Sequence, residues 1–243
     1  MSATINPDII TDGLVLCLDA GNSRSYPGSG NTWTDLSGNG NNGTMPSVSY
    51  NSDNKGNLIF DANTDYIMIP HNSIFNFNSA FTLSVWIKIN TLNLTSIYNI
   101  LSKKTSFNNT QKGWSCQLDY RDNGIVQYRN NDATGLYDHT PNATLNNMSL
   151  LNQTSYYKNI VWVIRTAPDN LLVYIDGISR SAPQAVFYTD TDTTNNLYIG
   201  KTLTSPSDPA PPISIGQISL YNRPLSPADI QQNYLATKGR YGL

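Results

Sequence analysis

The segment that decides the fold is Phe81-Thr-Leu-Ser-Val-Trp-Ile-Lys-Ile89. Its odd-numbered positions are all apolar, whereas Thr82, Ser84 and Lys88 are polar. Because successive side chains of a β-strand point to opposite faces, this alternation predicts a half-buried strand with one face on a hydrophobic core.

Two later segments predict a β-hairpin. Asn159-Ile-Val-Trp-Val-Ile-Arg165 is apolar on both faces through its middle, and Leu171-Leu-Val-Tyr-Ile-Asp-Gly177 follows it after a turn around Pro168-Asp-Asn170. Asp176-Gly177 and Asp122-Asn-Gly124 each predict another tight turn, since Gly and Asn tolerate the positive φ that such turns require.

Strand candidates recur from Leu14 to Tyr221 without a linker, so we expect one domain over residues 1–243, a length that sandwiches often reach as single units. Near the end, Ser226 suits a helix N-cap, Pro227 the first helical position, and Asp229 the capping-box position. The expected fold class is all-β, with a short C-terminal helix over about 227–236.

Charge excludes two classes of partner. The formal net charge is −2, with no basic stripe, so we expect neither nucleic-acid binding nor attachment to a membrane surface. The first seven residues lack a basic region followed by an apolar core, so no secretory signal is expected. The chain is therefore expected to be made in a cytoplasm. No apolar run approaches the ~18 residues of a spanning helix.

Two cysteines are too few for a zinc motif or a disulfide framework. Cys17 lies in an apolar run and is expected to be a buried small hydrophobe. A bridge between Cys17 and Cys116 is left open by the sequence.

The order of motifs along the chain resembles the laminin-G-like branch of the concanavalin A-like lectin and glucanase superfamily. The matching segments are Gly13–Asp19, Asp35–Thr44, Leu58–Asp61, Asp65–Pro70, Phe81–Ile89, Tyr156–Gly177, Leu197–Gly200 and Ile215–Ser226. The resemblance implies a concanavalin A-like jelly-roll β-sandwich of two antiparallel sheets. Gln217 and Ser219 stand where family members often carry acidic residues, which puts a family metal site on that strand in doubt.

The segments Ser23–Gly30 and Asn31–Trp33 are similar to a variant common in virion proteins of tailed bacteriophages. This resemblance implies a capsid decoration or fibre subunit on the virion surface. Its partners would be other virion proteins, further copies of the chain and host cell-surface glycans. The alternative is a free lectin-like module that binds carbohydrate.

Catalysis is not expected, so the chain is interpreted as a non-enzyme. The glucanases of the superfamily that this chain resembles use two Glu side chains on one strand. Here all 17 acidic residues are Asp, so that mechanism has no residue to use. Asp190 and Asp192 come closest to such a pair, but they lie in a polar run typical of a solvated loop. The two histidines, His71 and His139, have no adjacent nucleophile, and His71 is expected at a rim.

A sugar site needs aromatic faces for the ring and amide or carboxylate groups for its hydroxyls. One segment is richest in both, and its candidate residues are Trp114, Tyr120, Tyr128, Asn130, Asn131, Asp132 and Tyr137. The alternative is that these aromatic rings belong to the core, as most do in a sandwich. Trp86 and Trp162, on predicted central strands, are expected in the core.

Calcium is the metal that the loop composition favours, because hard cations prefer carboxylate, amide and carbonyl oxygens. The candidate ligands are Asp19, Asp35, Asn39 and Asn41. The alternative is that the loop's glycines set turns while its Asn side chains bond their own backbone.

Overall fold

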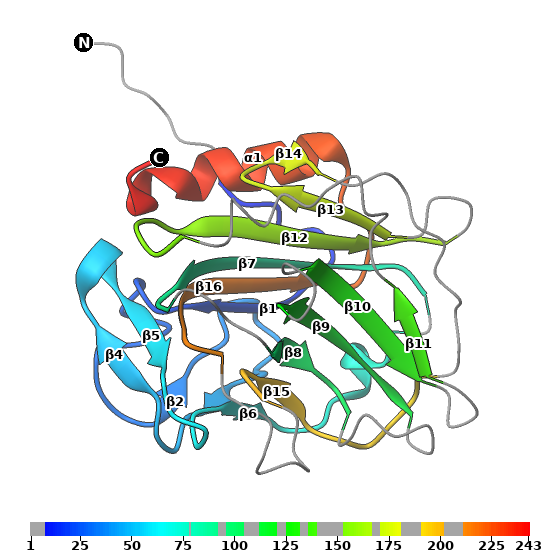
Figure 1. Ribbon diagram of the computed structural model, residues 1–243, viewed down its shortest axis with the longest axis horizontal. Helices are drawn as coiled ribbons and strands as arrows, with labels where there is room; N and C mark the ends of the chain where they lie inside the picture. The colour runs from blue at the N-terminus through cyan, green and yellow to red at the C-terminus, as the bar shows by residue number, and fades with distance from the viewer. Residues whose placement is uncertain are drawn as a thin grey trace.

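Two antiparallel β-sheets face each other in the computed structural model, with a helix across the outer side of one of them (Figure 1). The structure describes residues 8–77, 79–91, 96–104, 112–120, 125–131, 136–139, 153–166, 171–180, 191–201 and 211–243. This architecture confirms the predicted fold class.

Sheet A has the strand order β14-β13-β12-β7-β16-β5-β4, and β1 pairs with β16 off this path. Its strands are β1 (Leu14–Asp19), β4 (Ser49–Asn51), β5 (Asn57–Phe60), β7 (Phe81–Ile89), β12 (Lys158–Ile164), β13 (Leu171–Ile175), β14 (Ile178–Ser179) and β16 (Ile213–Tyr221).

Sheet B has the order β11-β10-β9-β8-β15-β6-β3-β2. Its strands are β2 (Thr32–Trp33), β3 (Gly43–Thr44), β6 (Ile67–Ile69), β8 (Ile97–Ser102), β9 (Gly113–Asp119), β10 (Ile125–Asn131), β11 (Leu136–His139) and β15 (Leu197–Ile199). The helical elements are α1 (Pro227–Thr237) and the 3₁₀ turns η1 (Asp53–Lys55), η2 (Ser73–Phe75) and η5 (Lys238–Tyr241).

The predicted hairpin is confirmed. Strands β12 and β13 pair from Ile160 opposite Ile175 to Ile164 opposite Leu171. Beyond them, Asp176 has φ +54° and Gly177 has φ +75°, as the tight turn requires. The expected turns at 168–170 and 122–124 lie outside the described residues.

Strand β7 corrects one prediction. Its odd positions, from Phe81 to Ile89, enter the core between the sheets as expected. The other face is buried too, because Trp86 stacks on Tyr241 with ring centroids 4.2 Å apart. Half-burial was wrong because alternation along one strand cannot reveal that a distant C-terminal segment covers its polar side. Trp162 lies between the sheets, whereas Trp86 is buried outside sheet A.

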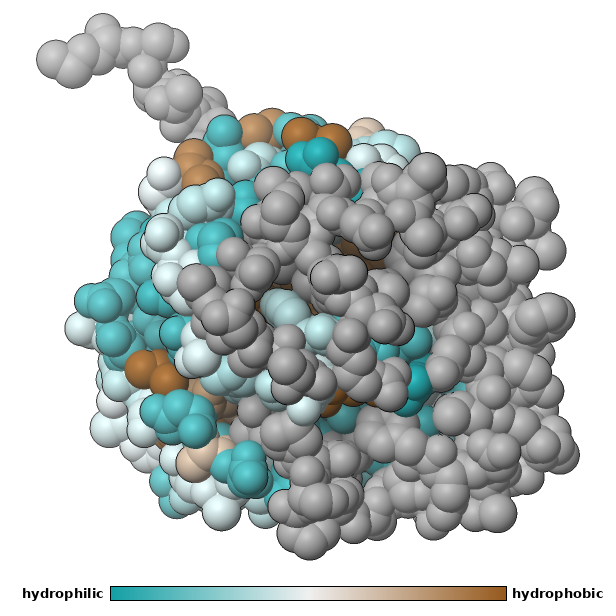
Figure 2. Space-filling model, viewed as in Figure 1, coloured by the Kyte–Doolittle hydropathy of each residue, from teal (hydrophilic) through white to brown (hydrophobic). Residues whose placement is uncertain are grey.

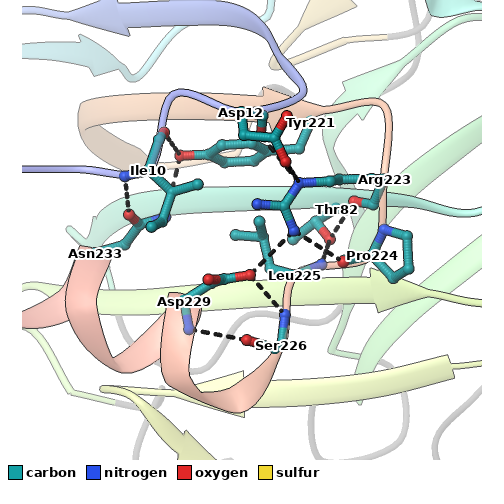
Figure 3. A network of polar contacts seen from close by, with 10 residues as sticks. All are labelled: Ile10, Asp12, Thr82, Tyr221, Arg223, Pro224, Leu225, Ser226, Asp229 and Asn233. Atoms are coloured by element: carbon teal, nitrogen blue, oxygen red, sulfur yellow. Dashed lines mark hydrogen bonds and ion pairs between the residues drawn. The ribbon is translucent and has the colours of Figure 1, made fainter.

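Helix α1 begins as the sequence predicts and ends at Thr237, one residue beyond the expected end. The Ser226 hydroxyl accepts a hydrogen bond from the Asp229 N–H at 3.2 Å, and the Asp229 carboxylate accepts one from the Ser226 N–H at 3.0 Å. Arg223 also donates to Asp229 at 3.0 Å (Figure 3). This reciprocal cap satisfies two backbone donors at the helix start.

Long-range hydrogen bonds hold α1 to sheet A. The Thr82 hydroxyl in β7 accepts from the Leu225 N–H at 2.9 Å. Asn233 of the helix accepts from the Ile10 N–H at 2.7 Å, and the Tyr221 hydroxyl donates to the Ile10 carbonyl at 3.0 Å (Figure 3). The helix is therefore a fixed cover.

Both cysteines are buried and free, which answers the question of a bridge. Cys17 is 4% exposed, as expected of a small core side chain. Over β4 and β5, at the left of Figure 2, the surface is mainly hydrophilic. Among the described residues, no helix combines the length and apolar character needed to cross a membrane.

Candidate functional site

Strand β9 divides its side chains sharply between two faces. Trp114, Cys116 and Leu118 point into the core, whereas Ser115 and Gln117 lie between them in sequence and so face the outer side of sheet B. All five are fully buried. Buried polar groups are more informative than exposed ones, since burial costs free energy unless a partner is supplied.

Neighbouring strands extend these polar positions into two rows. In the first row, Gln117 lies opposite Asn99 of β8 and Gln127 of β10. In the second, Ser115 lies opposite Ser102 and Arg129. We call this set the polar face, and its members are Asn99, Ser102, Ser115, Gln117, Gln127 and Arg129. Every member is buried.

In the described part of the chain, several oxygens of the polar face have no hydrogen-bond partner. They are Asn99 Oδ1, Ser102 Oγ, Gln117 Oε1 and Gln127 Oε1. The Gln117 amide does donate to Ser115 Oγ at 2.8 Å. Leaving a buried polar group unpaired costs about 1–3 kcal/mol. A cluster of such groups on one face therefore calls for water or a polar ligand.

A pocket of about 550 Å³ lies at one end of sheet B. We call it the end pocket, and its lining residues are His71, Asn76, Lys112, Asp192, Thr193, Thr194 and Asn195. These residues follow β6, precede β9 or precede β15, so they meet where the neighbouring strand β8 ends at Ser102. The second row of the polar face is thus the row nearest the end pocket.

Lys103 stands behind the wall of the end pocket. Its side chain is fully buried, and its ammonium donates to the carbonyls of Thr193 at 3.1 Å and Asn195 at 2.8 Å. The same Nζ lies 3.0 Å from His71 Nδ1. Burial lowers the pKa of Lys103 to about 8, and the Asp192 carboxylate partly offsets this shift. The ammonium ties the segment before β15 to His71, which is exposed at the rim as expected.

Three of the four aromatic residues chosen from the sequence do not form a platform at this site. Trp114 and Tyr128 are core residues that both pack against Phe81, and Tyr120 is buried beside Tyr98 at the other end of β9. These three rings are therefore buried, as the alternative interpretation expected. Because core and outer residues alternate, the sequence reasoning selected the aromatic positions and missed the polar face between them.

The remaining predicted sugar contacts are only partly described. Asn130 is buried in β10, one position beyond Arg129. Asn131 in β10 and Tyr137 in β11 are placed by their backbones alone, and Asp132 lies outside the described residues. Their role in sugar binding stays a prediction.

The predicted calcium ligands of the glycine-rich loop are engaged with protein atoms. Asp35 Oδ1 accepts from the backbone of Cys17 and of Ser37, each at 2.9 Å, and Oδ2 accepts from the Asn41 N–H at 3.0 Å. Asn39 donates to Ser37 Oγ at 3.0 Å. This is the geometry of the alternative interpretation, in which the loop's polar side chains organise its backbone.

Asp19 has protein partners of its own. It accepts from the Gly21 N–H at 2.8 Å and forms an ion pair with Arg240. Within the described part of the chain, no three His, Cys or Asp side chains gather as a metal site would require. Calcium binding and a loop organised by its own side chains make opposite predictions for the effect of added calcium on Tm.

The fold is similar to several solved structures. The binding domain of Paraclostridial Mosquitocidal Protein 1 is 20% identical with a TM-score of 0.68, and the match covers 92% of this chain and 52% of that one. The receptor-binding domain of a botulinum neurotoxin C/D mosaic serotype is 16% identical with a TM-score of 0.66, covering 93% and 51%. Trypanosoma rangeli sialidase in complex with sialic acid is 16% identical with a TM-score of 0.64, covering 98% and 37%.

The chain therefore spans about a third to about half of the length of these structures. At such identities the likeness shows the fold alone. No curated protein matches the chain. A family model described as Concanavalin A-like lectin/glucanases superfamily matches residues 61–231, which is more than half of the sequence. The chain belongs to this laminin-G-like family of the concanavalin A-like lectin/glucanase superfamily.

Proposed function

We propose that this lectin-like domain is a carbohydrate-binding module whose ligand occupies the end pocket and reaches the polar face of sheet B. The observation that carries the proposal is the cluster of unpartnered buried oxygens on Asn99, Ser102, Gln117 and Gln127. Amide and hydroxyl groups can both donate and accept, and sugar hydroxyls do the same. Their arrangement in rows on three neighbouring strands suits a ligand with several hydroxyls.

The end pocket supports the same function by its size and composition. A volume of about 550 Å³ lies within the roughly 300–1,000 Å³ typical of small-molecule sites. Its lining offers hydroxyl, amide, imidazole and charged groups, which can fix the orientation of a polar ligand. Ser102 and Lys103 connect the pocket to the polar face through adjacent positions of the chain.

The test compares three substitutions of the same type. Gln117→Leu and Gln127→Leu remove amides of the polar face, whereas Gln217→Leu removes a buried amide of β16 in sheet A whose Oε1 is also unpartnered. A broad glycan array identifies a ligand, and calorimetry measures its affinity for each variant. We expect the first two variants to lose about tenfold or more and Gln217→Leu to bind as the native protein does. Equal losses in all three, or no glycan bound at all, would contradict the proposal.

We also propose that the domain does not hydrolyse the glycan that it binds. The sequence contains no Glu, so the paired-Glu mechanism of glucanases has no residue to use. Purified protein should release no sugar from β-glucan or from chromogenic glycosides above the blank. Turnover that a polar-face variant abolishes would show that the domain is an enzyme.

A position on the virion surface is a second proposal, supported by the resemblance of residues 23–33 to phage virion proteins. In the fold this segment is fixed to sheet A, since Ser25 Oγ accepts from the Asp19 N–H at 3.0 Å and Tyr26 packs on Tyr50. Its partners would be capsid or fibre subunits. Mass spectrometry of purified particles should detect the chain, and its absence from them would leave the free lectin-like module as the better interpretation.

A further inference from the structure

The Lys103 ammonium has no donor left for a ligand. It carries three N–H groups, and three acceptors surround it at 2.8 to 3.1 Å, namely Thr193 O, Asn195 O and His71 Nδ1. Lys103 therefore acts on a ligand only through the wall that it holds in place and through its charge.

The same contact fixes the proton of His71. An ammonium can only donate, so Nδ1 must be the acceptor, and the neutral ring then carries its proton on Nε2. His71 lines the end pocket, so it offers a donor rather than an acceptor from its second nitrogen.

Among the described residues of the end pocket, positive charge outweighs negative charge. Lys112 is on the lining and Lys103 is directly behind it, whereas Asp192 is the single carboxylate among the lining residues that the structure describes. A concave site with an excess of one sign concentrates ligands of the opposite sign, the more so when one of the charges is buried in a low-dielectric wall. The site therefore favours an anion.

We infer that the end pocket selects a sugar residue that carries an anionic group, with Lys112 and the Nε2–H of His71 as its donors and the polar face contacting the hydroxyls of the same glycan. This inference rests on the proposed function and names the ligand class of that site. The anionic group can be a carboxylate or a sulfate, which share negative oxygens that accept from ammonium and imidazole donors.

The experiment titrates three oligosaccharides of equal length into the full chain: an oligogalacturonate, a sulfated galactose oligomer and a neutral galactose oligomer. We expect at least one anionic oligomer to bind about tenfold or more tightly than the neutral one. The difference should shrink between 0.05 and 0.5 M NaCl, because salt screens the attraction. The first two oligomers distinguish a carboxylate site from a sulfate site.

Matched variants distinguish a residue that selects the anionic group from one that positions the pocket wall. Lys112→Met should weaken only the anionic oligomer, by about tenfold, whereas Lys55→Met removes an equal charge from the exposed turn η1 and should change nothing. Lys103→Met should weaken neutral and anionic oligomers alike and speed amide exchange in residues 191–196.

Equal binding of neutral and anionic oligomers, or a Lys112→Met variant that keeps the preference, would overturn the inference and leave the proposed function standing. Failure of every oligomer and of the glycan array would reject both.

Discussion

The outer faces of the two sheets are both buried, yet they are built from opposite chemistry. Helix α1 and turn η5 cover sheet A, and the side chains packed there form apolar and aromatic clusters that include Trp86, Tyr221 and Tyr241. Sheet B carries rows of amides, hydroxyls and a guanidinium instead. The outer face of sheet A is thus closed by apolar contacts, whereas that of sheet B keeps four buried oxygens that lack a hydrogen-bond partner in the described structure.

Sheet A has unpartnered polar atoms as well, but their setting differs. Gln217 Oε1 and the hydroxyls of Tyr157 and Tyr241 lack partners. Gln217 faces a cavity of about 10 Å³ together with Ser84 and Ser219, which is room for roughly one water molecule. On sheet B the unpartnered atoms lie in rows that lead toward a pocket of about 550 Å³.

The largest expected effect tests the cover of sheet A. Trp86→Ala removes a ring stacked between Tyr234 and Tyr241 and a hydrogen bond of 2.9 Å to Thr237. We expect the free energy of unfolding in urea to fall by about 3–5 kcal/mol. A loss below about 1 kcal/mol would mean that the helix and η5 contribute little to the burial of sheet A.

Each sheet has one buried cysteine, Cys17 in β1 of sheet A and Cys116 in β9 of sheet B. Burial raises the pKa of Cys17 from 9.0 to about 12, and raises that of Cys116 as well. The folded state keeps the thiol protonated after the unfolded chain has released its proton. The stability from this difference is complete below pH 9 and is lost as the pH rises toward 12.

Cys17→Ala removes this pH dependence. Between pH 8 and pH 10.5, the stability of the native protein relative to Cys17→Ala should fall by about 2 kcal/mol. The titration of Lys103 acts in both proteins and cancels in the comparison. Urea unfolding at the two pH values measures the change, and parallel curves would show that the Cys17 thiol is not buried as described.

A smaller effect is expected on sheet B. Gln117→Leu removes the unpartnered Oε1 but also the hydrogen bond to Ser115 Oγ, so the two changes offset each other. The free energy of unfolding should change by less than about 1 kcal/mol, while glycan binding weakens by about tenfold or more. Gln217→Leu is the control for sheet A. A destabilised Gln117→Leu protein with unchanged binding would show that the polar face is a structural network.

The smallest expected effect concerns calcium. Asp35 is bonded to its own loop and Asp19 to Arg240, so addition of 2 mM calcium chloride should shift Tm by less than about 1 °C. A rise of several degrees, absent in Asp35→Asn, would show that calcium replaces these bonds.

Local patterns in the sequence predicted the elements well. Alternation identified β7, the Asp-Gly turn located the β12–β13 hairpin, and the Ser226 cap located the start of α1. Each depends on neighbours within a few residues. The sugar site was sought in aromatic residues of β9 and β10, whose rings turned out to be core, although the same alternation marked Ser115 and Gln117 for the opposite face.

The sequence by itself determined that paired-Glu chemistry has no residue to use, and it determined which stretches become strands. Only the tertiary structure decided that Gln127, Gln117 and Asn99 form one row, because register between strands depends on pairing across the whole sheet. It also decided that Lys103 donates a hydrogen bond to the carbonyl of Asn195, which lies 92 residues later in the sequence. Burial and long-range contact turn ordinary polar residues into a candidate site, and neither can be seen in local sequence.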